Sequence, residues 1–378
     1  MDLNEIRGEI DTVDNDLLGL FLERMGLSEK VAEYKSLHSI PILNRVRERE
    51  ILAEMTAKAP EKEKYVYRFF ENLMSLSRAR QTELTASTSN IRTLIEKALA
   101  SAEDVFPQTG TVACQGIEGA NSQVACDKLF PRGHIVYVKT FEAVFDAVES
   151  GLCKFGVLPI ENSSFGSVRS IYELLQKKHC SIVRGTRLCI HHELLAKPGT
   201  KQKDITEIYS HEQAIGQCSR FLSSLSGVKI IPCANTAVAA KMVAQSDNPH
   251  AAAISSHPCT ALYGLVTVNA DIQDSDNNYT RFICITKNPV IYAGSNKISL
   301  ITASENRPGA LYEILSRFSA AGVNMSKLES CPVISRDFEF IFFIELDASV
   351  REAGVVSMLE DMERSCENFI FLGSYSEV

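Results

Sequence analysis

The chain has 378 residues, of which 45% are hydrophobic and 23% are charged. One hydrophobic core rarely serves so long a chain, so two or three domains are expected, and this composition excludes intrinsic disorder and a fibrous protein. The formal net charge of −8 is spread without long runs of either sign. Small molecules are therefore the expected ligands, and neither nucleic acid nor an anionic membrane is an expected partner.

Cysteine usage and the first residues bear on location and cofactors. The 11 cysteines fall at irregular intervals, with no CxxC pair and no Cys/His cluster of the metal-binding kind. His191 and His192, as neighbours in a strand, would point to opposite faces and do not suggest a shared metal. The N-terminus is charged from its start, and no apolar run approaches a bilayer span. We expect a reduced cytoplasmic protein without metal or cofactor.

Residues 1–88 show the pattern of an all-helical domain. Apolar residues recur every three or four positions from Leu3 to Val31, which predicts one long helix. Two more helices are predicted near 44–58 and 63–86, with Pro60 in the break between them. This segment contains no strand candidate.

Two cations interrupt the apolar stripe of the first helix. Arg24 and Lys35 are eleven residues apart, which returns them to nearly the same side, so both should face inward. A buried unpaired cation is costly and needs an anionic partner. That partner is either a protein acid such as Glu48 or a dianionic ligand, and spacing alone leaves both open. Arg7 lies off the stripe and too far along the helix for the same ligand, although it can reach a site across a dimer.

Residues 109–287 alternate short β-branched runs with helical stretches. The runs are Ile135–Val138, Gly156–Ile160, Ser181–Val183 and Val228–Ile231. The alternation predicts a mostly parallel α/β domain in two lobes. Segments 85–90 and 288–296 are the expected joints.

Residues 297–378 predict the order strand, helix, strand, strand, helix, strand. The expected elements are Lys297–Ala303, Ala310–Ala321, Val323–Glu329, Phe338–Leu346, Val350–Cys366 and Phe369–Tyr375. This βαββαβ order is a ferredoxin-like α+β plan. The fold class expected for the whole chain is therefore multidomain, with all-α, α/β and α+β parts.

Seven polar residues of the helical segment stand in a specific order. They are Arg7, Arg24, Lys35, Arg47, Glu48, Ser77 and Gln81. Their order and spacing resemble the active site of the all-helical chorismate mutases, particularly the mutase domain of the bifunctional P-proteins. Asn44 is a departure, because the family usually carries Asp there, near the substrate hydroxyl.

The resemblance implies a Claisen rearrangement of chorismate to prephenate. Such a reaction needs no acid, base or nucleophile, so catalysis comes from holding the folded conformer and stabilising the polarised transition state. Arginines would clamp the two carboxylates. Lys35 and Gln81 would donate to the ether oxygen, and Glu48 would take the ring hydroxyl. The family places Arg7 in the partner's site, which implies a homodimer or homotetramer.

The string PIENSSFG at 159–166 follows a strand-like run and opens a helical stretch. Alone, such a loop is either an anion site or a capped turn. It resembles the PIEN(S/T) motif of prephenate dehydratases. Further matches to that family stand at Tyr209–His211, Gln213, Gln217, Leu262–Leu265 and the TRF motif Thr280–Phe282.

This second resemblance implies conversion of prephenate to phenylpyruvate by loss of carbon dioxide and water. Thr280, the family's essential threonine, would donate a hydrogen bond to the departing hydroxyl. The implied substrate-binding residues are Ser122, Glu161, Asn162, Ser163, Ser210, Gln217, Arg281 and Phe282, together with Asn44 in the mutase. The Gly-rich loop 115–122 departs from the family pattern, with Asn121 where an aromatic residue is usual.

The turn at 306–311 carries Pro and Gly at the start of a predicted helix and alone indicates only a tight bend. In context it resembles the GAL region of ACT domains attached to prephenate dehydratases. Residues 329–332 match their ESRP motif except for Cys331. The resemblance implies phenylalanine binding, a feedback effect and these contact residues: Pro308, Gly309, Ala310, Leu311, Glu329 and Ser330.

Two hypotheses follow from these patterns. The first is a bifunctional enzyme of phenylalanine biosynthesis with a mutase domain at 1–88, a dehydratase domain at 109–287 and a regulatory ACT domain at 297–378. The alternative is a phenylalanine-binding regulator whose catalytic domains have decayed, suggested by Asn44, Asn121 and Cys331. A solute-binding module explains neither the helical segment nor the TRF motif. No GxGxxG follows a strand, which disfavours a fused dehydrogenase.

Overall fold

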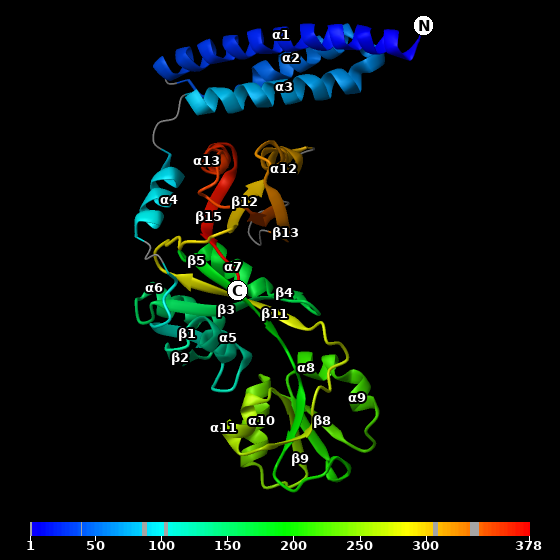
Figure 1. Cartoon of the computed structure of the whole chain (residues 1–378), viewed down its shortest axis with the longest axis vertical. Helices are drawn as coiled ribbons and strands as arrows, with labels where there is room; N and C mark the ends of the chain where they lie inside the picture. The colour runs from blue at the N-terminus through cyan, green and yellow to red at the C-terminus, as the bar shows by residue number, and fades with distance from the viewer. Residues whose placement is uncertain (1, 39, 85–88, 102–104, 305–308, 333–339) are drawn as a thin grey trace. The chain divides into compact units, whose positions relative to one another are not determined.

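The computed structural model describes residues 2–38, 40–84, 89–101, 105–304, 309–332 and 340–378 (Figure 1). The chain divides into two compact units. One comprises residues 1–93 and 357–365, and the other comprises residues 94–356 and 366–378.

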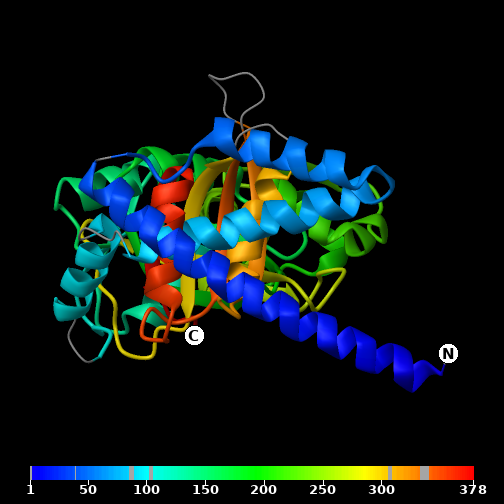
Figure 2. The same cartoon turned by 90° about the horizontal axis from the view of Figure 1, so that it is seen from above.

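Three helices dominate the first unit and confirm the predicted helical segment. They are α1 (Leu3–Leu37), α2 (Arg45–Lys58) and α3 (Glu63–Leu84), with a short 3-10 turn η1 (Pro60–Lys62) before α3. Figures 1 and 2 show the three helices side by side. Asn44 caps α2, because its side-chain oxygen accepts a hydrogen bond from the Arg47 N–H at 3.1 Å.

The apolar stripe of α1 is not covered by this chain. Every described residue from Asp2 to Leu20 is exposed, and only Ser28 and Ala32 of this helix are buried. The exposed apolar side chains include Leu3, Ile6, Ile10, Val13, Leu17, Leu20, Leu27 and Val31. In Figure 2 the N-terminal part of α1 extends beyond α2 and α3. The sequence predicted that this stripe faces inward, and this prediction is wrong for the described residues. Helices α2 and α3 do not cover the stripe.

Helix α4 (Asn90–Ala100) was not predicted. It begins in the region expected to be a joint, of which residues 85–88 lie outside the described residues. Its apolar residues Ile91, Ile95 and Ala98 are buried. Arg92 forms two hydrogen bonds of 2.7 and 2.8 Å to Glu360, so the segment is a packed element.

The second unit begins with a lobe built on a mixed sheet. The strands are β1 (Thr111–Gln115), β2 (His134–Val138), β3 (Phe155–Asn162), β4 (Gly166–Ser167), β5 (Ser181–Cys189) and β11 (Tyr279–Thr286), in the order β2-β1-β3-β11-β5 with β4 beside β3. The helices are α5 (Asn121–Leu129), α6 (Phe141–Glu149) and α7 (Arg169–Lys177).

The chain leaves this lobe after β5 and returns to it as β11, forming a second lobe in between (Figure 1). The strands of that lobe are β6 (Glu193–Ala196), β7 (Glu207–Ser210), β8 (Lys229–Pro232), β9 (Ala251–Ser255) and β10 (Val266–Asn269), ordered β10-β6-β9-β7-β8. Its helical elements are η2 (Gln202–Asp204), α8 (Glu212–Gln217), α9 (Ser219–Ser223), α10 (Thr236–Gln245) and α11 (Pro258–Tyr263).

The two lobes confirm an α/β architecture but correct the expectation of mostly parallel sheets. Strand β11 inserts between β3 and β5 and runs antiparallel to both. In the second lobe β6 is antiparallel to β9 and β10, while β7 is parallel to β8 and β9. The direction of β11 follows from its role as the return strand, which re-enters the first sheet from the far lobe.

The C-terminal part forms a third, antiparallel sheet. Its strands are β12 (Lys297–Ser304), β13 (Asn324–Pro332), β14 (Phe340–Asp347) and β15 (Glu367–Tyr375), in the order β13-β14-β12-β15. Helices α12 (Ala310–Ala320) and α13 (Val355–Ser365) complete the predicted succession of strands and helices. The segment 288–296 that precedes β12 is packed, because Ile291 and Tyr292 are buried.

Strands β15 and β5 join the third sheet to the first lobe. An added Cβ at Gly373 would lie 2.1 Å from the Ile182 carbonyl oxygen, so only glycine permits this approach. The last residues continue along β5, where the Gly185 N–H donates to the Ser376 carbonyl at 2.9 Å and Val378 returns a bond to Gly185 at 3.0 Å. Side chains from both sheets, including Ile182 and Phe343, share one core.

Candidate active sites

Adjacent strand ends bring together Thr280 and Asn162, the two polar residues at the centre of the dehydratase motifs. Thr280 of β11 pairs in register with Asn162 at the end of β3. The Asn162 side-chain nitrogen donates a hydrogen bond to the Thr280 hydroxyl oxygen at 2.9 Å. The Asn162 side-chain oxygen accepts from the N–H groups of Ser164 and Phe165 at 3.0 and 3.1 Å. The loop after β3 thus wraps around one amide and aims it at the threonine.

Further polar side chains continue this group toward the second lobe. Asn278 accepts from Asn162 at 3.1 Å and from Gln217 at 3.1 Å, and it donates to Gln217 at 3.0 Å. The Gln217 oxygen also lies 2.7 Å from His192 Nε2. The group therefore collects residues from β3, β11, α8 and the connection between β5 and β6, at the junction of the two lobes.

Sequence reasoning missed two members of this group. Asn278 stands two residues before Thr280, and the period-two alternation of an extended chain would have placed both on one face. His192 was considered only as a metal ligand. It is 3% exposed, and burial lowers the pKa of its imidazole, an effect that Gln217 opposes in part. The ring is therefore neutral near pH 7.

Ser163 fastens the motif loop to the start of β11. Its hydroxyl donates to the Asn277 carbonyl at 2.8 Å and accepts from the Tyr279 N–H at 2.9 Å. The Ser163 N–H in turn donates to the Tyr279 carbonyl at 2.8 Å. These three bonds hold the loop against the strand that carries Thr280.

Two other predicted substrate residues lie apart from this hydrogen-bonded group. Ser210 is fully buried, and its hydroxyl donates to the Ile254 carbonyl at 2.8 Å. Ser122 is buried in the first turn of α5. The Gly-rich loop before it is held by the second lobe, where the Tyr263 hydroxyl donates to the Glu118 carbonyl at 2.8 Å.

Three more predicted substrate residues face other surroundings. Arg281 donates to both oxygens of Glu345 at 2.7 Å and also pairs with Glu377, so its guanidinium belongs to the junction with the third sheet. Phe282 is 1% exposed within the core of the first lobe. Glu161 pairs with Lys327 of β13 at 2.9 Å. Alternation along β3 and β11 explains the positions of Glu161 and Arg281, because the immediate neighbours of Asn162 and Thr280 point to the other face of the sheet.

In the helical unit, the structure pairs Arg24 and Lys35 with neutral oxygens. Arg24 donates to the Ser77 hydroxyl and, at 3.4 Å, to the Leu73 carbonyl. The Lys35 ammonium donates to the Ile42 carbonyl at 2.5 Å. Burial lowers the pKa of both side chains, and for Lys35 the nearby charge of Glu48 opposes the shift in part. Within the described residues, neither cation forms an ion pair with a protein acid.

The remaining predicted mutase residues are partly assembled. Glu48 forms an ion pair of 2.5 Å with Arg78, a residue that the sequence did not single out. Arg47 is exposed and pairs with Glu50 at 3.2 Å. Gln81 is buried one turn beyond Ser77 on α3. Arg7 lies in the exposed first half of α1, away from the others.

The residues predicted to contact phenylalanine lie at the start of α12 and on β13. Gly309 has φ +85° and precedes Ala310, the first residue of the helix, which is buried. Glu329 accepts a hydrogen bond from the Ser167 hydroxyl at 2.8 Å. Leu311 is half-buried and Ser330 is exposed, whereas Pro308 lies outside the described residues.

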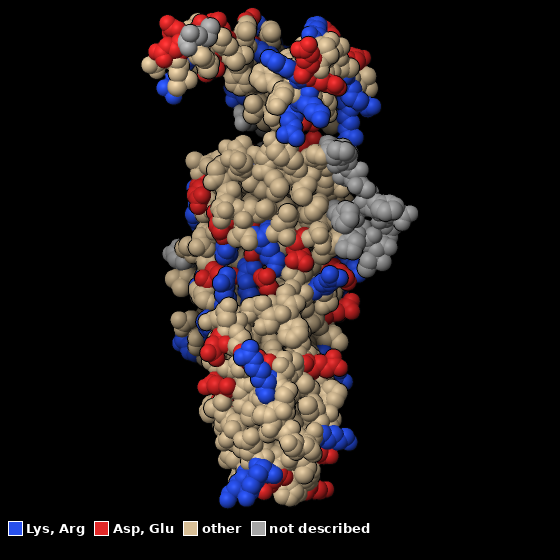
Figure 3. All heavy atoms as spheres, turned by 90° about the vertical axis from the view of Figure 1, so that its right-hand side faces the viewer, with Lys and Arg blue, Asp and Glu red and all other residues tan. Residues whose placement is uncertain are grey.

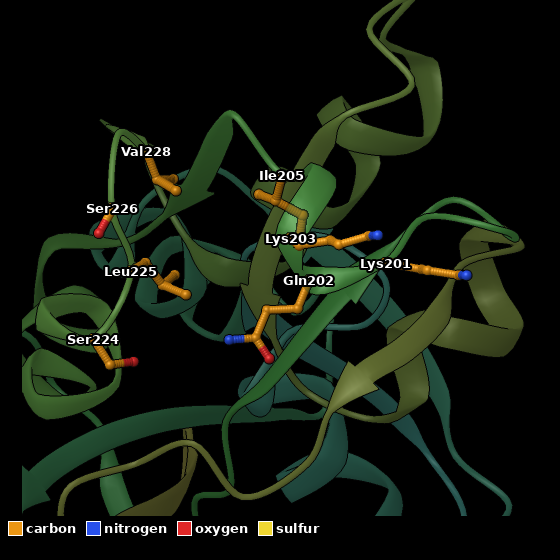
Figure 4. A pocket seen from close by; sticks show the side chains of 8 residues that line it. All are labelled: Lys201, Gln202, Lys203, Ile205, Ser224, Leu225, Ser226 and Val228. Carbon is orange, nitrogen blue, oxygen red and sulfur yellow. The ribbon is translucent and has the colours of Figure 1, made fainter.

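The charges on one face and a hollow in the second lobe are two features of the surface. Figure 3 shows Lys and Arg interspersed with Asp and Glu on one face, without a large patch of one sign. A hollow of about 430 Å³ in the second lobe is lined by the stretches 201–205 and 224–228 (Figure 4). None of the predicted site residues lines it, and we assign it no role. Among the described residues, no helix combines the length and apolar character that a bilayer span requires.

Comparisons with known proteins identify the families that two segments of the chain match. Residues 112–290 match the family model of prephenate dehydratase, and residues 6–82 match that of type II chorismate mutase. The Escherichia coli (strain K12) bifunctional chorismate mutase/prephenate dehydratase is 28% identical over 98% of this chain and 95% of its own length. An Arabidopsis thaliana arogenate dehydratase/prephenate dehydratase is 34% identical over 70% of this chain and 72% of its length.

Among solved structures, the prephenate dehydratase of Arthrobacter aurescens in complex with L-Phe is 28% identical, with a TM-score of 0.65, and the match covers 70% of this chain and 89% of that chain. These matches show that the chain belongs to the prephenate dehydratase family. With the mutase segment on the same polypeptide, it is a bifunctional enzyme of phenylalanine biosynthesis that has chorismate mutase and prephenate dehydratase activities.

The position of Arg281 yields a first prediction. Arg281→Met should lower the free energy of unfolding by about 3–5 kcal/mol, because it leaves the buried Glu345 carboxylate without its partner. The Michaelis constant for prephenate should change little. Arg187→Met is the control, since Arg187 also pairs with Glu377 but is 60% exposed, and it should cost less than about 1 kcal/mol. Urea unfolding and dehydratase kinetics measure both, and normal stability with a large rise in the Michaelis constant would instead support a substrate contact.

Proposed function

We propose that the two activities are divided between the cations of the helical unit and the polar group around Thr280, within domains at 1–88 and 109–287. The main support for the mutase site is that the half-buried side chains of Arg24 and Lys35 donate hydrogen bonds to neutral oxygens. Positive charge left without a protein acid in its hydrogen-bonded surroundings favours a doubly acidic ligand such as chorismate. The further mutase contacts that we propose are Arg7, Arg47, Glu48, Ser77 and Gln81.

The chemistry of the rearrangement fits these groups. Lys35 and Gln81 donate to the ether oxygen as the bond breaks, and Arg24 holds a carboxylate. Glu48, oriented by Arg78, accepts the ring hydroxyl. Asn44 uses its oxygen to cap α2, so the residue that departs from the family pattern has a structural role at the start of the helix that carries Glu48.

In the dehydratase site Thr280 donates its proton in a hydrogen bond to the departing hydroxyl of prephenate. Its oxygen already accepts from Asn162, which leaves the O–H free to point outward. Aromatisation of the ring supplies the driving force, so a neutral donor suffices. Asn162, Ser163 and Gln217 position the substrate and the loop.

A homodimer is the smallest assembly that we propose. The exposed apolar stripe of α1 supports it, because a contiguous apolar surface of this length is a protein interaction site. A second copy of α1 carries the same stripe and can cover it in a self-complementary contact. Arg7 would then enter the partner's mutase site, completing the set of cations. A homotetramer is compatible with the same contact.

The C-terminal segment 297–378 is proposed to be a ferredoxin-like ACT domain that binds phenylalanine. Its strand order, with the first and third strands central, supports this assignment. Glu329 and Lys327 on β13 contact Ser167 and Glu161 of the β3–β4 hairpin. Because the same hairpin carries Asn162, phenylalanine bound near β13 can act on the dehydratase site. All eleven cysteines are free, which supports a reduced, cytoplasmic setting.

Single substitutions should separate the two activities. Arg24→Ala should abolish mutase turnover and spare dehydration of supplied prephenate, because only the helical unit loses a carboxylate clamp. Thr280→Val should abolish dehydration and spare the mutase, because the isosteric change removes only the hydroxyl. Assays of chorismate loss and phenylpyruvate formation measure each step. Loss of both activities in either folded variant would refute the proposed division.

The shared mutase site predicts complementation between inactive chains. A heterodimer of Arg7→Ala and Arg24→Ala chains, isolated with two affinity tags, should recover about half of the wild-type mutase rate, because one of its two sites is intact. The matched control is a heterodimer of Arg24→Ala and Lys35→Ala chains, in which both sites stay damaged. Equal inactivity of the two heterodimers would show that Arg7 does not act across the interface.

The contact of Lys327 with the hairpin predicts a regulatory variant. Lys327→Met should keep basal dehydratase turnover within about threefold and raise the phenylalanine concentration for half-inhibition at least about tenfold, since coupling energies of this kind are typically about 1–3 kcal/mol. Calorimetry should show that phenylalanine still binds. Unchanged inhibition would mean that the signal does not pass through this ion pair.

A further inference from the structure

The backbone fixes the polarity of the hydrogen bonds around Asn162, that is, which atom of each pair donates and which accepts. The Asn162 oxygen faces the N–H groups of Ser164 and Phe165, and a backbone N–H can only donate. If the amide were flipped, its NH2 group would face these two N–H groups, and no hydrogen bond can form between donors. Its nitrogen is therefore the atom that faces Thr280 and Asn278.

This polarity is passed on from one side chain to the next. Asn278 must present its oxygen to Asn162, so its nitrogen faces Gln217 and, at 3.5 Å, the Ile190 carbonyl, which can only accept. Gln217 must then present its oxygen to Asn278, and that same oxygen lies 2.7 Å from His192 Nε2. His192 is consequently protonated on Nε2.

We propose that His192 is a positioning residue of the dehydratase: through a relay of hydrogen bonds, Gln217–Asn278–Asn162, it keeps in place the Asn162 amide, whose nitrogen makes the Thr280 oxygen an acceptor and leaves its proton for the substrate. This inference rests on the proposed role of Thr280. His192 itself is buried behind Gln217 and in this relay touches only that amide.

The opposite histidine tautomer is incompatible with this arrangement. A proton on Nδ1 would leave Nε2 facing the Gln217 oxygen, two acceptors without a hydrogen between them. If the Gln217 amide were flipped to face Nε2 with its nitrogen, its contacts with Asn278 would join donor to donor and acceptor to acceptor. If Asn278 were flipped as well, its nitrogen would face the nitrogen of Asn162, which the backbone holds in place. In each of these arrangements at least one hydrogen bond between His192 and Asn162 would be lost. Burial keeps the ring neutral, so a single tautomer satisfies the whole relay.

Two substitutions and a neighbouring control test the proposal. His192→Leu removes the donor and should lower the dehydratase kcat by about 10- to 100-fold, the range expected when one buried hydrogen bond is lost. The Michaelis constant should stay within about threefold. His192→Gln keeps an N–H at the same reach and should restore most of the rate. His191→Leu is the control, because His191 is exposed and pairs with Asp271 at 2.9 Å, and it should behave as wild type.

Circular dichroism and thermal unfolding of the same chains report whether the dehydratase lobes are folded, because the mutase residues lie in the other compact unit. A wild-type dehydratase rate in His192→Leu would overturn the proposal, as would a His192→Gln variant as slow as His192→Leu. If Thr280→Val dehydrates normally, the proposed role of Thr280 fails. If Thr280→Val is inactive while His192→Leu is normal, only the relay fails.

Two further measurements separate a relay from simple packing. In a double-mutant cycle on kcat, His192→Leu combined with Asn278→Ala should be no slower than the slower single variant, since both interrupt one chain. If the two substitutions lower kcat by the product of their separate effects, His192 and Asn278 have independent roles. Nitrogen-15 NMR of the wild-type enzyme, labelled at histidine, should show the His192 ring protonated on Nε2 and not on Nδ1. The reverse tautomer would contradict the polarity on which the inference depends.

Discussion

Two backbone N–H groups give the dehydratase site its orientation. They fix the oxygen of Asn162, and because an amide has one acceptor end and one donor end, they also fix what Thr280 receives. The loop that supplies them is held by Ser163 against the start of β11. The Thr280 hydroxyl, for which we propose a catalytic role, is a poor acid by itself and accepts a hydrogen bond from an amide that the loop backbone holds in one orientation. The site depends on geometry more than on ionisation, which suits a reaction driven by aromatisation.

In the helical unit the main feature is two partly buried positive charges. A partly buried cation seeks a partner, and Arg24 and Lys35 donate only to neutral oxygens within the described residues. The adjacent acid Glu48 forms its ion pair with Arg78, although its charge still raises the pKa of Lys35 in part. The same unit also exposes the apolar stripe of α1. The two proposals for this unit, a dianionic ligand at the two cations and a second chain along α1, rest on these two observations.

Much of the fold could be predicted from the sequence, since helical and strand periodicities mark the elements of all three parts. The sheet directions could not, because β11 lies next to β3 only through a return from the second lobe that no local pattern encodes. The motifs identified Thr280, Asn162 and Gln217, which the structure brings together. They also suggested Arg281, whose side chain points to the other face of the strand toward Glu345. His192 was overlooked because a buried neutral histidine carries no spacing signal, and its hydrogen-bond partner Gln217 is 25 positions away in the chain.

Strand alternation also gives the β3–β4 hairpin two separate sets of contacts. On β3, Asn162 faces the polar group around Thr280, whereas Glu161 beside it pairs with Lys327 of the third sheet. On β11, Thr280 faces the same polar group and Arg281 pairs with Glu345 of β14. The other face of β3 carries the half-exposed pair of Glu161 with Lys327, and the other face of β11 carries the buried pair of Arg281 with Glu345. Because breaking a buried ion pair is costly, a shift of β14 would have to move the start of β11 with it or break that pair. The position of the Thr280 hydroxyl is thereby tied to the packing of the third sheet.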